Sequence, residues 1–374
     1  MKAIGVIVEY NPFHNGHAHH LKQAKDKGKP DCVIAVMSGN FVQRGEPAIL
    51  DKWTRAKLAI ENGVDLVIEL PFAYSIQSAD LFAFGSVDIL DKLKVSELYF
   101  GSEKDNMKEL EQIVDLFTQS KFQLKLKELI DEGNNYPSAN GKAVMALTGL
   151  NFTSNDNLGI QYLSSIKKLN SKMKAFTIER IHSNYLDKEA THNTIASATS
   201  IRTMEDPSNY VPKNTLAALS GKKYTWGDYY ELLKYKVISS NLEDIAEVKE
   251  GIENRILNLI KENSFEDFLA KLYTRRYPQN RLRRILTNIL CNVTKEDIEM
   301  LKLDSGVDYI RVLAMNDTGR KYLKSIKKDI EFPIISKASE TDSLMMKIEI
   351  KTTRIYDEHL YEKEFKPLIY NKNT

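Results

Sequence analysis

The sequence is poor in cysteine and carries no large excess of charge of either sign. Of its 374 residues only Cys32 and Cys291 are cysteines, and they lie far apart, without the spacing of a metal site. This excludes a disulfide framework and indicates a reducing, cytoplasmic environment. With 53 basic and 51 acidic residues, the chain cannot coat a nucleic acid uniformly, so any RNA-binding surface must be a local patch.

Long hydrophobic runs are also missing. No stretch approaches the ~20 apolar residues that a membrane helix requires. The N-terminus shows no basic region followed by an apolar segment and a cleavage site. We therefore expect a cytoplasmic protein without a membrane span. At 374 residues it is long enough for two or three domains.

Histidine, by contrast, is concentrated near the N-terminus, where four of the seven histidines lie between His14 and His20. They follow an apolar run at residues 4–8, typical of a buried parallel strand, and precede a predicted helix at residues 18–27. Such a junction presents free backbone N–H groups and the positive end of the helix dipole to an anion. Gly16 lets a phosphate approach closely, and His14 and His17 add donors. The alternative is a surface turn that carries histidines by chance.

Apolar strands and amphipathic helices alternate through the first half of the chain. Strands are predicted at residues 4–8, 32–37, 64–70, 98–100 and 174–180, and helices at 52–61, 77–92, 107–131, 137–149 and 157–169. This order predicts an α/β protein with a Rossmann-like doubly wound parallel sheet, whose ligand binds at the carboxyl ends of the strands. Beyond Pro207 the pattern becomes mainly helical, at 216–219, 229–238, 245–260 and 265–272. We therefore predict a catalytic, ATP-binding domain at 1–206 and a mainly α-helical C-terminal region at 207–374.

Two further segments would lie near the carboxyl ends of the strands. The loop at residues 38–47 contains Gln43 and Arg44, and it would close over a substrate with Arg44 on a phosphate or carboxylate. A solvated loop, in which Arg44 pairs with Glu46, is the alternative. Residues 195–202 are rich in small hydroxyl side chains. They would cap a helix facing an anion, with Arg202 nearby, or form a plain helix N-cap.

A basic segment at residues 271–284 contains six basic residues, no acidic residue and two tyrosines. This composition favours contacts with RNA phosphates and stacking on bases. A helical face solvated by arginines is the alternative. The candidate RNA-binding residues are Arg275, Arg276, Arg281, Arg283 and Arg284.

The HNGH run at residues 14–17 resembles the first signature of the nucleotidylyltransferase and class I aminoacyl-tRNA synthetase superfamily, and residues 195–202 resemble the second. The similarity is closer to one family. VEYNPFHNGH at 8–17, MSGNFVQRGEP at 37–47, DLVIELP at 65–71, QSAD at 77–80 and FGSE at 100–103 resemble the bacterial tRNA(Met) cytidine acetate ligase family. The match is dense over the first two hundred residues and thinner afterwards.

This resemblance implies a nucleotidylyltransferase-type fold and a two-step reaction. Acetate would attack ATP to give acetyl-adenylate and pyrophosphate. The acetyl group would then pass to N4 of the wobble cytidine of elongator tRNA(Met), forming N4-acetylcytidine. His14 and His17 would be catalytic. The two signatures together imply an ATP site comprising Ile7, Val8, Glu9, Tyr10, Asn11, Pro12, Phe13, His14, Asn15, Gly16, His17, Ala18, His19, His20, Gly101, Asn157, Arg180, Ser200 and Arg202.

Other parts of the site are expected from the chemistry. Mg²⁺ would bridge the phosphates of ATP. A positive donor must hold the acetate carboxylate, and Arg44, Lys52 and Arg180 are the candidates. Two other functions stay open: an adenylyltransferase that joins AMP to a phosphorylated metabolite, and an RNA-binding protein on a degenerate nucleotide fold. The sequence does not give the oligomeric state.

Overall fold

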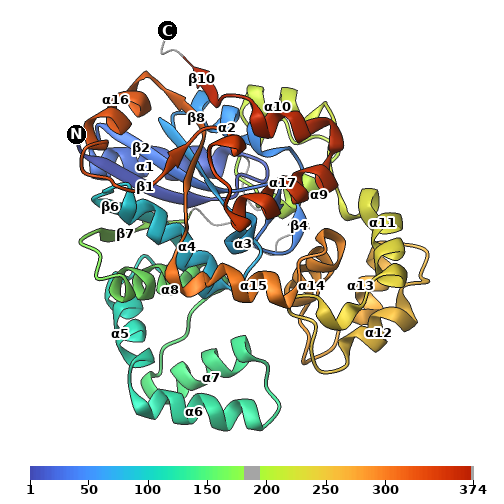
Figure 1. Cartoon of the computed structure of the whole chain (residues 1–374). Helices are drawn as coiled ribbons and strands as arrows, with labels where there is room; N and C mark the ends of the chain where they lie inside the picture. Colours follow the sequence, from blue (N-terminus) through green and yellow to red (C-terminus); the bar gives the residue numbers. More distant parts are fainter. Residues whose placement is uncertain (181–193, 372–374) are drawn as a thin grey trace.

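The computed structural model describes residues 1–180 and 194–371 (Figure 1). The strands are β1 (Ala3–Val8), β2 (Cys32–Ser38), β3 (Phe41–Val42), β4 (Glu46–Pro47), β5 (Leu66–Leu70), β6 (Glu97–Ser102), β7 (Lys174–Glu179), β8 (Ile310–Asn316), β9 (Ile334–Ile335) and β10 (Ile369–Asn371). The helices of the first half are α1 (Asn15–Gly28), α2 (Lys52–Glu61), α3 (Phe72–Ser75), α4 (Ala79–Lys92), α5 (Met107–Phe117), α6 (Ser120–Asp131), α7 (Tyr136–Thr148) and α8 (Ser154–Lys168). Those of the second half are α9 (Ala198–Thr203), α10 (Lys213–Leu219), α11 (Trp226–Ser239), α12 (Ile252–Leu259), α13 (Phe265–Leu272), α14 (Gln279–Cys291), α15 (Lys295–Leu301), α16 (Asp317–Ile326) and α17 (Leu344–Tyr356).

The main sheet has the order β10-β8-β5-β2-β1-β6-β7. Its five strands from β5 to β7 are parallel. Taken along the chain, these five occupy the spatial order third, second, first, fourth, fifth, so the direction of winding reverses between β1 and β6. At such a reversal the loops separate and leave a crevice at the carboxyl ends of the strands. The prediction of a Rossmann-like α/β fold is confirmed.

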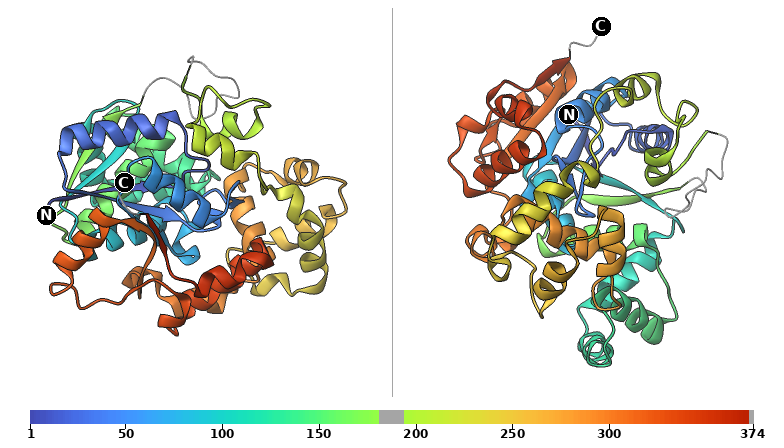
Figure 2. Two further views of the ribbon diagram at one scale, coloured as in Figure 1. Left: turned by 90° about the horizontal axis from the view of Figure 1, so that it is seen from above. Right: turned by 90° about the vertical axis from the view of Figure 1, so that its right-hand side faces the viewer.

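Both faces of this sheet are covered by helices, which explains why its central strands β2 and β5 are buried along their whole length. In β2, Val33 and Met37 lie in one core with side chains of α1 and α2. The alternate residues Ile34 and Val36 lie in a second core with α4 and α8. Each buried aliphatic side chain contributes about 1.5–3 kcal/mol relative to exposure. Figure 2 shows α1 on one side of the sheet and the C-terminal helices on the other.

The C-terminal region is mainly helical, as predicted, but it also returns to the main sheet. β8 pairs antiparallel with β5, and β9 and β10 pair parallel with β8. Helices α11 to α14 lie together on one side of the molecule (Figure 1), around a core that they share with Phe41, Trp53 and Phe72 of the first half and with Tyr356 of α17. The boundary at residue 206 stays a prediction. No helix of the described residues is long and apolar enough to cross a membrane.

Two local differences from the predicted elements follow from short-range signals. The helix predicted at 107–131 is divided into α5 and α6, because Thr118 ends the first helix and Gln119 precedes the second. The helix predicted at 245–260 is shorter, because Gly251, with a backbone φ of +80°, precedes α12, which begins at Ile252. Helices α6 and α7 extend away from the sheet as a hairpin (Figure 1).

Candidate active site

A cavity of about 230 Å³ lies at the crevice between β1 and β6. Its walls come from the ends of β1, β6 and β7, from the loops after β1, β2 and β7, and from α1, α4, α8 and α9. The predicted residues that line it are Ile7, Val8, Glu9, Tyr10, Asn11, His14, Gly16, His17, His19, His20, Gln43, Arg44, Gly101, Arg180 and Arg202. The fold therefore brings most of the predicted ATP-site residues to one place.

His14 is the N-cap of α1, and its ring is fixed by the backbone. The N–H of Gly16 donates to His14 Nδ1 at 3.0 Å, and the N–H of His14 donates to His17 Nδ1 at 3.3 Å. The two rings stack with centroids 3.7 Å apart. An Nδ1 that accepts a hydrogen bond places the proton of a neutral imidazole on Nε2. Each ring therefore carries its N–H donor at Nε2.

Electrostatics keep these imidazoles neutral. Burial, with help from Arg180 and Arg202, lowers the pKa of His14 to about 3. Burial, His14 and Arg180 lower the pKa of His17 well below its usual value. Neutral rings still donate one hydrogen bond each, so the pair can bind an anion without taking up a proton.

The helix N-terminus itself differs from the prediction of free backbone N–H groups. Asn15 N–H donates to the carbonyl of Tyr210 at 2.9 Å, and His17 N–H donates to the carbonyl of His14 at 2.9 Å. The N–H groups of His14 and Gly16 donate to imidazole nitrogens, as described above. All four backbone N–H groups of residues 14–17 therefore have an acceptor within the protein. The donors that remain for a phosphate at this junction are the imidazoles.

Guanidinium groups flank the cavity on two sides. Gly101 lies against Arg180, since a Cβ at this glycine would stand 3.3 Å from Arg180 Cγ. Arg202 donates to the carbonyl of Asn11 at 2.9 Å and pairs with Glu46 at 3.4 Å. Two positive side chains from strand β7 and helix α9 thus converge on the site, which suits a polyphosphate.

Some predicted residues do not line the cavity. Phe13 is fully buried and packs against Tyr10 with ring centroids 4.7 Å apart. The Asn15 amide donates to the carbonyls of Thr194 and Asn209. Ser200 is buried. Pro12, Ala18 and Asn157 also lie outside the lining, and a role for each of these residues in ATP binding stays a prediction.

The cavity also contains residues that the sequence did not indicate. Asn155, Tyr162 and Thr199 line it. Asn155 and Tyr162 lie on α8, two residues before and five residues after the predicted Asn157, and they share a face of the helix that Asn157 does not. Helical periodicity identifies the face of α8 that packs on the sheet, but it does not identify which residues reach a ligand.

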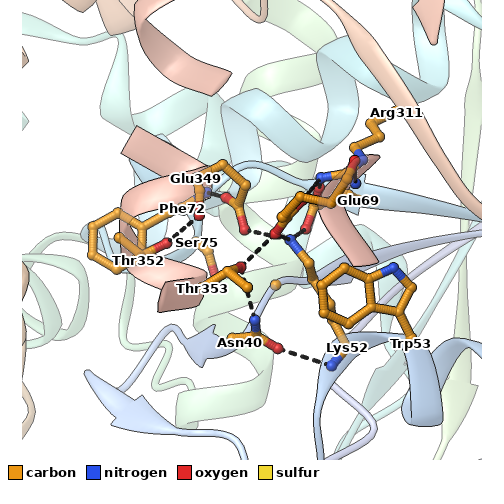
Figure 3. Close-up of polar contacts among 12 residues, drawn as sticks. Asn40, Lys52, Trp53, Glu69, Phe72, Ser75, Arg311, Glu349, Thr352 and Thr353 are labelled. Atoms are coloured by element: carbon orange, nitrogen blue, oxygen red, sulfur yellow. Dashed lines mark hydrogen bonds and ion pairs between the residues drawn. The ribbon is translucent and has the colours of Figure 1, made fainter. Parts of the chain in front are cut away.

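Lys52, a candidate for the acetate carboxylate, lies elsewhere. Its side chain is fully buried, and Nζ lies 2.6 Å from Glu69, 2.9 Å from Glu349 and 2.8 Å from Glu364 (Figure 3). Burial alone would lower the pKa of Lys52, but these carboxylates raise it above its usual value. Lys52 therefore stabilises the fold and cannot reach a ligand in the cavity. The sequence could not indicate this contact, because two of the three glutamates come from the last thirty residues of the chain.

The basic segment at residues 271–284 divides into engaged and accessible parts. Arg283 lies 3.5 Å from Glu46 and Arg284 lies 3.6 Å from Glu247. Arg281 stacks over the ring of Tyr277 at 4.4 Å. Arg275 is exposed, and Arg276 is 68% exposed although it lies 2.9 Å from Glu250. The segment thus meets the rim of the cavity through Glu46 and leaves positive charge on the surface beyond it.

Comparison with known proteins places this site in a family. The family model described as HIGH Nucleotidyl Transferase matches residues 1–371. The tRNA(Met) cytidine acetate ligase of Anoxybacillus flavithermus is 42% identical over 95% of this chain and 94% of its own length. The enzyme of the same name from Bacillus subtilis is 39% identical over 95% and 92%. The chain belongs to the tRNA(Met) cytidine acetate ligase family.

Solved structures of this family have the same fold. The crystal structure of Thermotoga maritima TmcAL in its apo form superimposes with a TM-score of 0.92 at 31% identity, and both chains are covered completely. The same protein bound with alpha-thio ATP gives a TM-score of 0.88 at 30% identity, again over both complete chains. The resemblance read from the sequence is confirmed, including its extension through the C-terminal region.

Proposed function

We propose that this chain is an ATP-dependent ligase that activates acetate as acetyl-adenylate and transfers the acetyl group to N4 of the wobble cytidine of elongator tRNA(Met). The observation that carries the proposal is the neutral pair His14 and His17, fixed at the crevice of a chain that matches the family over its whole length. A relative bound with alpha-thio ATP supports ATP as the nucleotide.

The first step requires positioning and charge stabilisation more than covalent chemistry. An acetate oxygen attacks the α-phosphorus, and pyrophosphate leaves with the electron pair of the broken bond. Nε2–H donors of His14 and His17 would stabilise the charge that develops on the phosphates, assisted by Arg180 and Arg202. Loss of one such donor commonly costs ~3 kcal/mol, or about a hundredfold in rate. Arg44 and Arg180, which both line the cavity, are the candidates for the acetate carboxylate.

Mg²⁺ would enter this site with the nucleotide. The described residues contain no group of three or more histidine, cysteine, aspartate or glutamate side chains that could hold a metal ion. Magnesium in nucleotide sites usually takes its ligands from phosphates, water and one or two carboxylates. A site without a dedicated group of protein ligands is therefore compatible with a magnesium ion. The ion would supply neutralisation of phosphate charge.

The acceptor tRNA would approach from the helical region. Arg275, Arg276 and Arg281 offer positive charge near the cavity rim, and Tyr273, which is 52% exposed, offers a surface for base stacking. The wobble base is unpaired in the anticodon loop and can turn into the cavity without opening a duplex. A cytoplasmic location follows from this substrate and is part of the proposal.

The first experiment separates acetate activation from transfer. Labelled pyrophosphate should enter ATP when acetate is present and tRNA is absent, and His14→Ala or His17→Ala should lower this exchange about a hundredfold. Both variants should bind tRNA as the wild type does. Exchange that does not depend on acetate, or a dinucleotide product formed from a phosphorylated metabolite, would instead identify an adenylyltransferase.

A second experiment identifies product and acceptor together. Mass spectrometry of tRNA treated with protein, ATP and acetate should find one acetyl group on a single cytidine of elongator tRNA(Met). The double variant Arg275→Ala, Arg276→Ala should weaken tRNA binding and reduce its salt dependence by about 0.7–0.9 per lost phosphate contact. Arg320→Ala on α16 removes a comparably exposed charge elsewhere and should change neither.

A further inference from the structure

Glu9 occupies an unusual position for an acidic residue in a site that binds polyphosphate. It directly follows β1, lines the cavity and is partly buried. Its Oε1 accepts the backbone N–H of Gln43 at 2.8 Å. Oε2 accepts no hydrogen bond from any residue in the described ranges 1–180 and 194–371. One oxygen is therefore fixed to the loop after β2, and the other remains for a ligand.

This carboxylate lies on the side of the cavity that faces the helical region. Gln43, which fixes Oε1, is two residues from Gly45, and the Gly45 carbonyl accepts hydrogen bonds from Trp226 Nε1 and Thr287 Oγ1, both at 3.0 Å. His20 and Arg180 belong to the other side, where β7 ends. A nucleotide held by the imidazoles and an acceptor arriving over α11 and α14 would meet beside Glu9.

The proposed second step needs a proton acceptor, whereas the first does not. Acetate attacks ATP as an anion and loses no proton. In the second step a neutral aromatic amine attacks: the N4–carbon bond forms, the carbon–oxygen bond to the adenylate breaks, and AMP leaves with its electron pair. N4 must release one proton along this path. A positioned base commonly accelerates such a transfer by about 10²–10⁴-fold.

Several other groups of the described cavity are poorly suited to take this proton. His14, His17 and His20 are weak bases in this environment, because burial lowers the pKa of each, that of His14 to about 3 and that of His20 to about 4. Glu46 is held by two guanidinium groups, 3.4 Å from Arg202 and 3.5 Å from Arg283. Glu179 ends β7, on the side of Arg180.

We propose that Glu9 is the base that accepts the N4 proton of the cytidine during acetyl transfer. The proposal rests on the proposed function, because it presupposes an amine acceptor. Burial raises the pKa of Glu9 above its usual value, although the Gln43 N–H, Arg44 and Arg202 oppose this effect. A carboxylate with a raised pKa binds a proton more readily and releases it to solvent after AMP departs.

Glu9→Gln tests this role with little change of shape. The amide oxygen can still accept the Gln43 N–H, but the side chain can no longer take up a proton. We expect transfer from synthetic acetyl-adenylate to tRNA to fall about 10²–10⁴-fold, while acetate-dependent pyrophosphate exchange stays within a few fold of wild type. Glu231→Gln, whose side chain is 83% exposed on α11, removes the same charge at the surface and should alter neither rate.

Two results would overturn the proposal. If Glu9→Gln loses exchange as strongly as transfer, the residue acts in binding ATP or acetate; if transfer is retained, the proton goes to another acceptor. ATP binding measured by calorimetry distinguishes these results from misfolding. Should Glu9→Gln fail to fold, Glu9→Asp provides the same comparison, with transfer reduced and exchange preserved. Failure of the wild type in both assays would instead reject the proposed function itself.

Discussion

Gly45→Ala tests the close contact between the loop after β2 and the helical region. Gly45 has a backbone φ of +70°, and a methyl group there would lie 2.3 Å from the backbone N of Arg284 and 2.4 Å from the backbone C of Arg283. Both atoms belong to the main chain of α14, so no rotation of a side chain can relieve the overlap. Either α14 or the loop must move, which weakens the hydrogen bonds that the Gly45 carbonyl accepts from Trp226 and Thr287.

The expected cost has two separable parts. Alanine in the left-handed region costs about 1–2 kcal/mol, and forcing an extra methyl group into a packed contact costs about 1–3 kcal/mol. Gly149→Ala has only the first part, because Gly149 has a φ of +73° but no atom within 4 Å of the position of its Cβ. The difference between the two variants therefore measures the contact itself.

Urea unfolding followed by circular dichroism and tryptophan fluorescence provides the measurement. Gly45→Ala should lower the free energy of unfolding by about 1–3 kcal/mol more than Gly149→Ala. It should also slow acetyl transfer to tRNA more than pyrophosphate exchange, because α14 carries Arg281, Arg283 and Arg284 of the basic segment. Equal destabilisation by the two substitutions would refute the contact between the loop and α14.

The remaining predictions concern buried ionisable groups. Lys52→Met should lower the free energy of unfolding by about 3–5 kcal/mol, because it leaves carboxylates buried without their cation. Lys57→Met is the control, because the Lys57 side chain is 62% exposed. It should lower the free energy of unfolding by under ~0.5 kcal/mol in the same urea titration. Burial and a neighbouring carboxylate raise the pKa of Glu69 above its usual value, so Glu69→Gln removes a charge that its surroundings disfavour. Burial would raise the pKa of Glu364, but Lys52 and a guanidinium lower it. Glu364→Gln should therefore destabilise the protein more than Glu69→Gln. The reverse order of stability in thermal unfolding would contradict this assignment. Burial and a nearby guanidinium lower the pKa of His20 to about 4, below its usual 6.5. The stability that follows from this shift is present above pH 6.5 and is lost as the pH falls toward 4. His20→Gln should make this loss smaller when unfolding midpoints are measured from pH 7.5 to 4.5.

The parallel half of the fold could be predicted because its signals are local. Apolar runs with helical segments between them define β1, β2, β5, β6 and β7, and the winding rule for parallel strands then places their carboxyl ends together. The short hairpin of β3 and β4 lies within the predicted loop at 38–47. The histidine motif adjoins the first strand in sequence, so its place in the crevice follows directly. For these elements periodicity and chain order contain the needed information.

The strands β8 to β10 could not be predicted in the same way. β8 pairs with β5 across more than two hundred residues, with Val67 opposite Ala314. Its sequence, IRVLAMN, is apolar but short, and it follows a long helical region, so nothing nearby specifies a partner. Arg311 in this strand pairs with Glu69 at 3.2 Å inside the sheet. Long-range pairings of this kind depend on which surfaces remain uncovered after the first half has folded.

The same limit explains why one loop contains both ligand-facing and structural residues. Gln43 and Arg44 face the cavity, whereas the Asn40 amide donates to Thr353 at 3.0 Å within the buried charge cluster (Figure 3). Arg55 connects the two sides, because it donates to the carbonyl of Glu9 at 2.6 Å and also to the carbonyl of Gly39. A family motif such as MSGNFVQRGEP therefore covers residues that touch a ligand and residues that fix the loop. Only the direction of each side chain distinguishes them, and for Asn40 that direction is set by Thr353 from the far end of the chain.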